Sequence, residues 1–290
     1  MDDHTGRVGD ELHAEALSLE ALLLARGYLY ELFHKALGGD PTSELVAALT
    51  SAETLDVVDE YAEAGETMAK LRAFLAELAG RTADEGARVA FVSQAKDEYT
   101  RLFVGPNSLP AQPMESPHVT HEFALFQENT VAVRRIYAAR GLEPVRLNHV
   151  PDDHVSLMCD FMARIAFETL AAFRVDDMQA LRALASEQGT FAAAHMANWL
   201  PEFARLQSRT ANPLLYPQLP AALAEFVRLD VAFLAELMAW IDGRSDKECV
   251  AENECGRPES FARVEAAFGH VRALRLFGLE DCELRELADS

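Results

Sequence analysis

The sequence predicts an all-α, bundle-like fold, and three observations support that prediction. Apolar residues recur at helical spacing along most of the chain, and there is no convincing run of strand-like alternation. In the first periodic segment they share one helix face at Leu22, Leu29, Leu32, Phe33 and Leu37. Glycine and proline residues stand between the periodic segments, where they end helices. With 290 residues, half of them apolar, the chain has room for one large or two ordinary domains.

The helix boundaries follow from these breaks. The first helix should end at Gly38-Gly39 and the third at Gly80, because glycine terminates helices readily. Asp152 or Asp153 should cap a later helix, because a carboxylate accepts the free amide hydrogens of a first turn. The expected helices span residues 15–37, 43–64, 66–79, 84–103, 119–140, a segment that starts after residue 153, 176–187, 190–209, 220–240 and 260–277.

Two proline-containing interruptions divide the chain. Residues 106–117 hold four of the twelve prolines. Proline removes a backbone donor and disfavours helix in the preceding residue, so this segment should be an extended loop. The second interruption is the expected hinge between two helical domains. The predicted division is an N-terminal helical domain over 1–141, the hinge over 142–151, a C-terminal helical domain over 152–240, and an extension over 241–290 that carries a last helix.

The charge balance argues against two classes of partner. The chain has 26 Lys and Arg against 47 Asp and Glu, a formal net charge of −21. Proteins bind nucleic acids and anionic membrane surfaces through clustered Lys and Arg residues, which this composition disfavours. A basic partner such as a cationic peptide is compatible with the negative net charge. The acidic start of the chain has no signal-peptide pattern, and no stretch reaches the ~18 apolar residues that cross a bilayer. We therefore expect a cytoplasmic protein without membrane insertion.

The sequence carries no recognisable enzyme motif. It lacks the G-x-S-x-G nucleophile turn, the Walker A loop and a G-x-G-x-x-G that follows a strand. The four cysteines, which form no C-x-x-C pair, are predicted to be buried or idle thiols in a reducing compartment. They are Cys159, Cys249, Cys255 and Cys282. We therefore expect no catalytic residue, no bound metal and no cofactor.

One alternative function is a helical di-metal carboxylate enzyme. Glu31 and His34 have the Glu-x-x-His spacing of di-iron bundles, and Glu115 and His118 repeat it. The second pair lies in the proline loop, where residues three apart do not share a helix face, so solvated or structural roles are favoured. A denser group matches no known zinc or iron ligand pattern. It consists of His118, His121, Glu122 and His149, with Asp152, Asp153 and His154 nearby in sequence.

Charged residues on either side of the expected hinge differ in their predicted roles. Asp152 and Asp153, beside His154, are suited to accept a guanidinium group from a partner. Arg134 and Arg135 lie inside a predicted helix with no apolar region behind them, so they should occupy a solvated helix face rather than an export signal.

Three motifs occur in a characteristic order, followed by a weaker fourth. The first, Tyr-x-x-Leu-Phe-x-Gly-Pro, comprises Tyr99, Leu102, Phe103, Gly105 and Pro106. The second, Pro-x-Glu-Ser, comprises Pro113, Glu115 and Ser116. The third, Pro-Asp-Asp-His, comprises Pro151, Asp152, Asp153 and His154, and the fourth comprises Phe191, His195 and Trp199. With these motifs, residues 15–240 resemble the TorD/DmsD family of cytoplasmic chaperones for molybdoenzymes that are exported by the twin-arginine route.

The resemblance implies a binding protein rather than an enzyme. It would bind the twin-arginine signal peptide, and the body, of a molybdopterin-containing reductase precursor and hold it until the cofactor is inserted. The residues of the first three motifs, together with Trp199, would form the peptide-binding site, in a monomer or a domain-swapped dimer. Pro117-His118 and Cys159-Asp160 depart from the family pattern, which bears on the cargo. Structural roles for Tyr99, Phe103 and the other apolar motif residues as core residues stay open beside this interpretation.

Overall fold

Short polar side chains start many of the helices. Thr42, Ser51, Asp84 and Asp177 each accept a hydrogen bond from the backbone N–H three residues later, at 2.9–3.1 Å. The cap at Ser51 explains one difference from the prediction. The single helix expected over 43–64 is two helices, because Ser51 starts the second of them.

The computed structural model describes residues 3–105, 108–120, 128–146, 150–243, 258–277 and 282–287, with side chains from residue 16 onward. Its helices are α1 (Asp3–Leu37), α2 (Ser43–Leu49), α3 (Ala52–Ala62), α4 (Glu66–Arg81), α5 (Glu85–Tyr99), the π-helical turn η1 (Thr100–Val104), α6 (Ser116–Thr120), α7 (Glu128–Ala139), α8 (Val155–Arg174), α9 (Met178–His195), α10 (Leu200–Gln207), α11 (Gln218–Gly243) and α12 (Glu259–Ala273). The strands are β1 (Leu142–Pro144) and β2 (Leu284–Glu286). The predicted all-α class is confirmed, since the described strands are only these two short ones.

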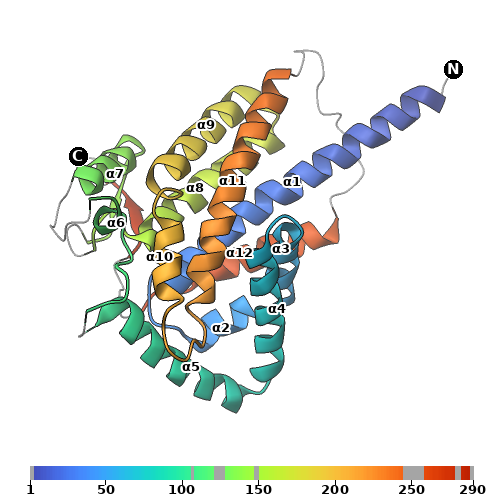
Figure 1. Ribbon diagram of the computed structural model, residues 1–290. Coiled ribbons are helices and arrows are strands. Elements are labelled where there is room, and N and C mark those ends of the chain that lie inside the picture. The colour runs from blue at the N-terminus through green and yellow to red at the C-terminus, as the bar shows by residue number, and fades with distance from the viewer. Residues whose placement is uncertain are drawn as a thin grey trace.

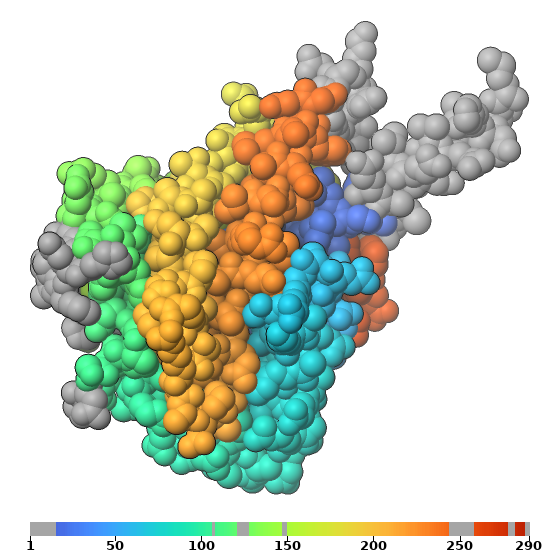
Figure 2. Space-filling view, in the orientation of Figure 1, coloured from blue at the N-terminus to red at the C-terminus, as the bar shows by residue number. Residues whose placement is uncertain are grey.

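The long helices α1, α8, α9 and α11 form the centre of the fold (Figure 1). α1 packs most extensively on α8, and α9 contacts both α8 and α11. α4 covers α11 and α3 covers α1, while α12 packs along α1. In the space-filling view α10 and α11 form a continuous strip between the green segments on one side and the blue segments on the other (Figure 2). No helix of the described residues has the length and apolarity needed to span a membrane.

One cluster of buried apolar residues includes side chains from before and after residues 142–151. Phe33 of α1 and Phe226 of α11 belong to it, with ring centroids 6.1 Å apart, and so does Phe161 of α8. The segments assigned to the two predicted domains therefore share core contacts. The division at 142–151 stays a prediction.

Several helix boundaries differ from the expected ones. α4 continues through Gly80 to Arg81, so the predicted stop at that glycine is wrong. The break expected between residues 187 and 190 is also wrong, because α9 is continuous and the chain turns at 196–199 instead. α6 begins at Ser116, inside the predicted proline loop.

The pairing of β1 with β2 was not predicted. The strands are antiparallel, with Leu142 opposite Glu286 and Pro144 opposite Leu284. Each strand has three residues, which is too short to show a strand-like alternation in sequence. The pairing joins the expected hinge segment to the C-terminal extension.

A buried ionic network joins three of the central helices. The Arg26 guanidinium of α1 donates to Asp230 of α11 at 2.6 and 3.1 Å and to Gln188 of α9 at 2.8 Å. The Tyr30 hydroxyl donates to the same carboxylate at 2.8 Å, and all four side chains are buried. Burial disfavours the charge of Arg26, but Asp230 outweighs it and raises the pKa of the guanidinium. One ion pair therefore holds α1 against α9 and α11.

Asp230→Asn should lower the free energy of unfolding by about 3–5 kcal/mol, because it leaves the charge of Arg26 buried without its counter-ion. Asp242→Asn is the matched control on the same helix, since Asp242 pairs with Arg182 where both side chains are exposed. That change should have little effect on stability, because exposed ion pairs are screened by water and salt. Urea unfolding followed by circular dichroism measures both variants. Equal losses would contradict a special role for the buried pair.

Candidate functional site

The first motif forms the junction between α5 and a π-helical turn. α5 runs directly into η1, whose last bond joins the Gly105 amide to the Thr100 carbonyl at 2.9 Å. Gly105 has φ +94°, a conformation that favours glycine. Leu102 and Phe103 are buried, whereas Val104 is 53% exposed. Pro106 lies outside the described residues.

An aromatic column extends from this junction to α10. Tyr99 stacks on Phe103 with ring centroids 4.9 Å apart, and Phe103 meets Phe203 at 6.4 Å. Phe203 contacts Trp199 at 5.4 Å, and Trp199 stacks on His118 at 5.2 Å. The predicted site residues Tyr99, Phe103 and Trp199 are thus brought into one continuous column.

Glu98 fixes the chain segment that carries Tyr216, whose ring contacts the aromatic column. The sequence analysis did not predict Glu98 as a site residue. Its buried carboxylate accepts hydrogen bonds from the backbone amides of Leu214 and Leu215, both at 2.7 Å, and of Tyr216 at 3.0 Å. Tyr216 in turn lies 5.3 Å from Phe103, centroid to centroid. The signal in sequence was an acidic residue three positions after Ala95, on the apolar face of its helix.

The second and third motifs pair with each other through their backbones. Met114 and His154 form an isolated antiparallel bridge. The Val155 amide donates to the Pro113 carbonyl at 2.8 Å, and the Glu115 amide donates to the Asp153 carbonyl at 3.1 Å. Two segments about forty residues apart in sequence are therefore one structural unit.

Asp153 is the centre of this unit. Its buried carboxylate accepts hydrogen bonds from the Ser116 amide at 2.8 Å, the Ser116 hydroxyl at 2.5 Å and the Thr130 hydroxyl at 3.0 Å. It therefore ties the first residue of α6 and the first turn of α7 to the start of α8. Asp153 is not the helix cap that the sequence analysis expected.

Asp152 binds a guanidinium, but the guanidinium belongs to this chain. Arg134 of α7 donates to both carboxylate oxygens, with the shortest distance 2.7 Å, and the Tyr137 hydroxyl donates to the Asp152 carbonyl at 3.1 Å. The hydrogen bond to Asp152 raises the pKa of Arg134. The prediction that Arg134 only occupies a solvated face is wrong, since this pair fixes α7 against the third motif.

His154 is the residue that caps α8. Its Nδ1 accepts a hydrogen bond from the Ser156 amide at 3.2 Å and lies 3.3 Å from the Cys282 sulfur. Burial lowers the pKa of His154 to about 3, and the neighbouring His34 adds to this effect. Because Nδ1 serves as the acceptor, the buried imidazole is neutral near pH 7.

Glu115 connects the second motif to the fourth. Its buried carboxylate accepts hydrogen bonds from His195 Nδ1 at 3.0 Å and from the side-chain Nδ2 of Asn198 at 3.4 Å. The Trp199 indole N–H donates to the His195 carbonyl at 2.7 Å. Asn198 was not predicted as a site residue.

The four ligands of the alternative metal enzyme have other partners. His34 Nδ1 lies 2.9 Å from the Ser156 hydroxyl, and Glu31 faces Lys35 at 3.8 Å. His118 Nε2 lies 2.8 Å from the Gln112 carbonyl. Among the described residues, no group of three or more His, Cys, Asp and Glu side chains is placed to hold a metal ion. The candidates His121, Glu122 and His149 lie outside those residues.

The accessible surface beside the motifs is a shallow groove of about 530 Å³ next to η1. Leu102, Gly105 and Pro110 line one part of it, and Arg101 and Arg209 line another. Val104 beside the groove and Val119 on α6 are two of the larger apolar side chains that stay exposed, at 53% and 42%. A ligand therefore reaches the edges of the motif elements, while most motif side chains lie beneath the surface. Their role in peptide binding stays a prediction.

Comparison with known proteins places this unit in a family. A family model described as nitrate reductase delta subunit matches residues 59–205, a range that contains every motif residue from Tyr99 to Trp199. The chain is 21% identical over 210 residues to a chaperone protein TorD of Aliivibrio fischeri, covering 72% of this chain and 94% of the relative. It is 24% identical over 141 residues to a chaperone protein TorD of Vibrio cholerae, covering 49% and 62%.

Asp153→Asn should lower the free energy of unfolding by about 2–4 kcal/mol, because the NH₂ group replaces one of the two acceptor oxygens and the buried hydrogen bonds to Ser116 and Thr130 lose the carboxylate charge that strengthens them. Asp177→Asn is the control. Asp177 caps α9 at the surface, and asparagine caps a helix as well as aspartate, so the change should cost a few tenths of a kcal/mol. Urea unfolding compares the two, and a loss at Asp153 no larger than at Asp177 would contradict the proposed clamp.

Acidification from pH 7 to pH 5 should cost about 2 kcal/mol of stability through His154, because its folded pKa lies below its unfolded value of about 6.5. Between these two pKa values the unfolded chain binds the proton and the folded chain does not. The stabilisation is therefore complete above pH ~6.5 and is lost as the pH falls. His154→Asn keeps a cap acceptor and should flatten this slope. The measurement is urea unfolding at several pH values, and an unchanged slope would contradict the assignment.

Proposed function

This chain belongs to the nitrate reductase delta subunit family, and from that membership we propose that it is a chaperone for the precursor of a molybdopterin-containing oxidoreductase. It binds the precursor's twin-arginine signal peptide in the cytoplasm and holds the precursor until its cofactor is inserted. No bond is made or broken in this activity. The observation that carries the proposal is the family match across the motif unit, supported by relatives that are named chaperones.

The motif residues act in this function mainly by positioning. Asp152, Asp153 and Glu115 hold the start of α8, the loop before α6 and the end of α9 together through buried hydrogen bonds. This gives a client a rigid surface, and a surface that is already ordered binds without the cost of ordering it. Leu102 and Gly105 line the groove, and Phe103 between them belongs to the buried aromatic column.

The signal peptide has two chemically different parts, and this chain offers a counterpart for each. The apolar region is suited to the groove beside η1 and to Val104 at its edge. The two arginines are attracted by the net charge of −21. Attraction between exposed charges is screened beyond ~8 Å at physiological ionic strength, whereas apolar burial is not weakened by salt.

Titration of a synthetic twin-arginine signal peptide at low and high salt tests both parts. The native peptide should lose affinity as salt rises, mostly through a slower association rate. A peptide with glutamines in place of the arginine pair should bind more weakly at low salt and depend little on salt. If both peptides bind alike at low salt, charge does not contribute to recognition. If neither binds, the proposed function is wrong.

Substituting two exposed valines of the continuous segment α5–η1 tests where the apolar region of the peptide contacts this chain. Val104→Ser should weaken binding of either peptide by roughly fivefold, because about 1 kcal/mol of apolar burial is lost. Val89→Ser on α5 is the control, since Val89 is similarly exposed at 55% but lies fifteen residues earlier in the helical segment, whereas Val104 directly precedes Gly105, which lines the groove. The same titration compares the variants, and equal affinities would exclude Val104 from the contact.

A further inference from the structure

The C-terminal segment 282–287 lies in a groove between β1, the end of α1 and the start of α8. Besides the β1–β2 pairing, the Val145 amide donates to the Glu283 carbonyl at 2.9 Å and the Leu287 amide donates to the Gly141 carbonyl at 2.7 Å. The segment is thus an added strand on the edge of β1. This segment lies beyond the range that the family model matches.

The side chains of the strand alternate between two environments. Cys282 and Leu284 are buried, at 0% and 3% exposure, so they anchor the strand in the groove. Glu283 lies between them and points to the other side, where its carboxylate is 2.6 Å from Lys35 Nζ and 3.9 Å from His34 Nε2. The groove therefore accepts a small apolar residue, an acidic residue and a leucine in succession.

The wall of the groove recognises the backbone of the strand. Asp160 accepts a hydrogen bond from the Leu284 amide at 2.7 Å, and Arg164 donates to the Leu284 carbonyl at 2.6 Å. The two side chains also pair with each other at 2.8 Å, which holds them in place. Because these bonds are made to the main chain, any extended peptide with suitable side chains can form them.

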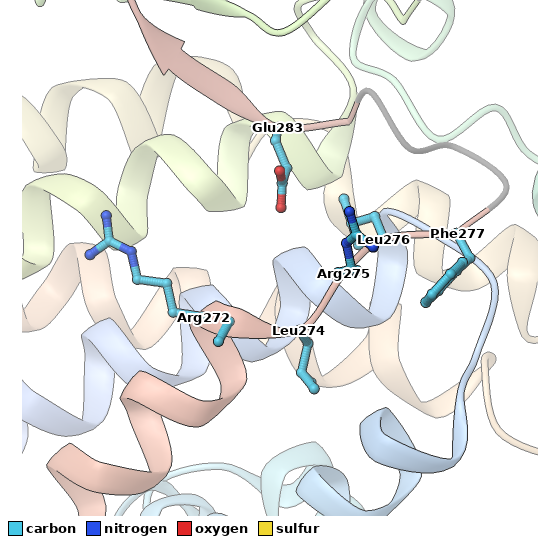
Figure 3. A pocket seen from close by; sticks show the side chains of 7 residues that line it. Arg272, Leu274, Arg275, Leu276, Phe277 and Glu283 are labelled. Atoms are coloured by element: carbon cyan, nitrogen blue, oxygen red, sulfur yellow. The ribbon is translucent and has the colours of Figure 1, made fainter.

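A basic cavity of about 520 Å³ opens beside the strand (Figure 3). Glu283 points into the space between Arg272 and Arg275, and Leu276 and Phe277 form part of the wall. The Arg272 guanidinium lies 5.9 Å from the centroid of the Phe167 ring, and among the described residues neither arginine forms an ion pair with a carboxylate. In a chain with net charge −21, two arginines in a cavity without a carboxylate partner favour further acidic groups of a bound peptide.

We propose that this groove is a receptor for an acidic, extended peptide segment of a partner protein, and that residues 282–287 fill it in cis. A partner strand would replace β2 by β-augmentation, forming equivalent main-chain bonds and placing its acidic residue on Lys35. The partner strand would have to displace β2 from β1, and this pairing is only three residues long. Short two-stranded sheets are marginally stable. The site prefers the opposite charge to that of a twin-arginine peptide, so it goes beyond the proposed function and fits the body of an acidic client.

Thiol labelling of Cys282 in the full-length chain tests the proposal, because the sulfur is buried only while the strand is in place. The background is Cys249→Ser with Cys255→Ser, and mass mapping of the labelled product separates Cys282 from Cys159. The probe is a capped peptide with the sequence of residues 280–287 and alanine in place of its cysteine. A control peptide carries lysine at the position of Glu283 and aspartate at the position of Leu284.

The probe peptide should accelerate labelling of Cys282 by roughly tenfold or more at saturation, as expected when a competitor turns a minor open state into the major one. The control peptide should have no effect, and Arg272→Gln with Arg275→Gln should reduce the effect of the probe. Leu284→Asp, which removes the anchor, should be labelled rapidly without peptide and so validates the readout. If the probe changes nothing while Leu284→Asp is labelled rapidly, the segment is only structural. Labelling that depends on protein concentration alone would also overturn the proposal, in favour of exchange between copies.

Discussion

The need to pair buried charges determines how the distant segments of this fold meet. Arg26 and Asp230 do this among the long helices, where one ion pair and its hydrogen bonds join α1, α9 and α11. Asp152, Asp153 and Asp160 do it at the start of α8, where Asp152 bonds to α7, Asp153 to α6 and α7, and Asp160 to the backbone of β2. A buried carboxylate without donors costs several kcal/mol, so only one arrangement of these segments satisfies all of them.

The site follows from the same constraint. The residues that identify the family are mostly beneath the surface, where they connect loop to helix and helix to helix. Under the proposed function, mutating such a residue would alter binding through the shape of the surface rather than through a lost contact. The same proposal assigns the direct contacts with a client peptide to the groove beside η1 and to the exposed Val104 next to it.

His154 links the motif unit to the C-terminal segment. The same ring nitrogen that caps α8 meets Cys282, the first buried residue of the added strand. The proposed strand-accepting groove therefore borders the motif unit. The two proposals involve peptides of opposite charge, since the strand-accepting groove is suited to an acidic segment and the net charge of −21 attracts a basic signal peptide. A precursor with a basic signal peptide and an acidic body would use both.

Local patterns in the sequence were sufficient for the all-α class, for the approximate positions of most helices and for the family. Periodicity, caps, glycine and proline act within a few residues, so they can be recognised without the fold. The same patterns also pointed to Asp152 and Asp153, either as helix caps or as acceptors of a partner's guanidinium group, and Asp152 accepts a guanidinium from Arg134 of its own chain. The wrong stop at Gly80 shows their limit, because α4 continues to Arg81 and is capped at Thr82, whose amide donates to the Leu78 carbonyl at 2.9 Å.

The partners of the buried polar groups came from tertiary packing alone. Asp152 pairs with Arg134, which is 18 residues away in sequence, and Asp153 bonds to Ser116, which is 37 residues away. β2 joins β1 across more than a hundred residues, through strands too short to leave a pattern. Which donor reaches which carboxylate depends on how helices pack, and no local feature of either residue encodes it.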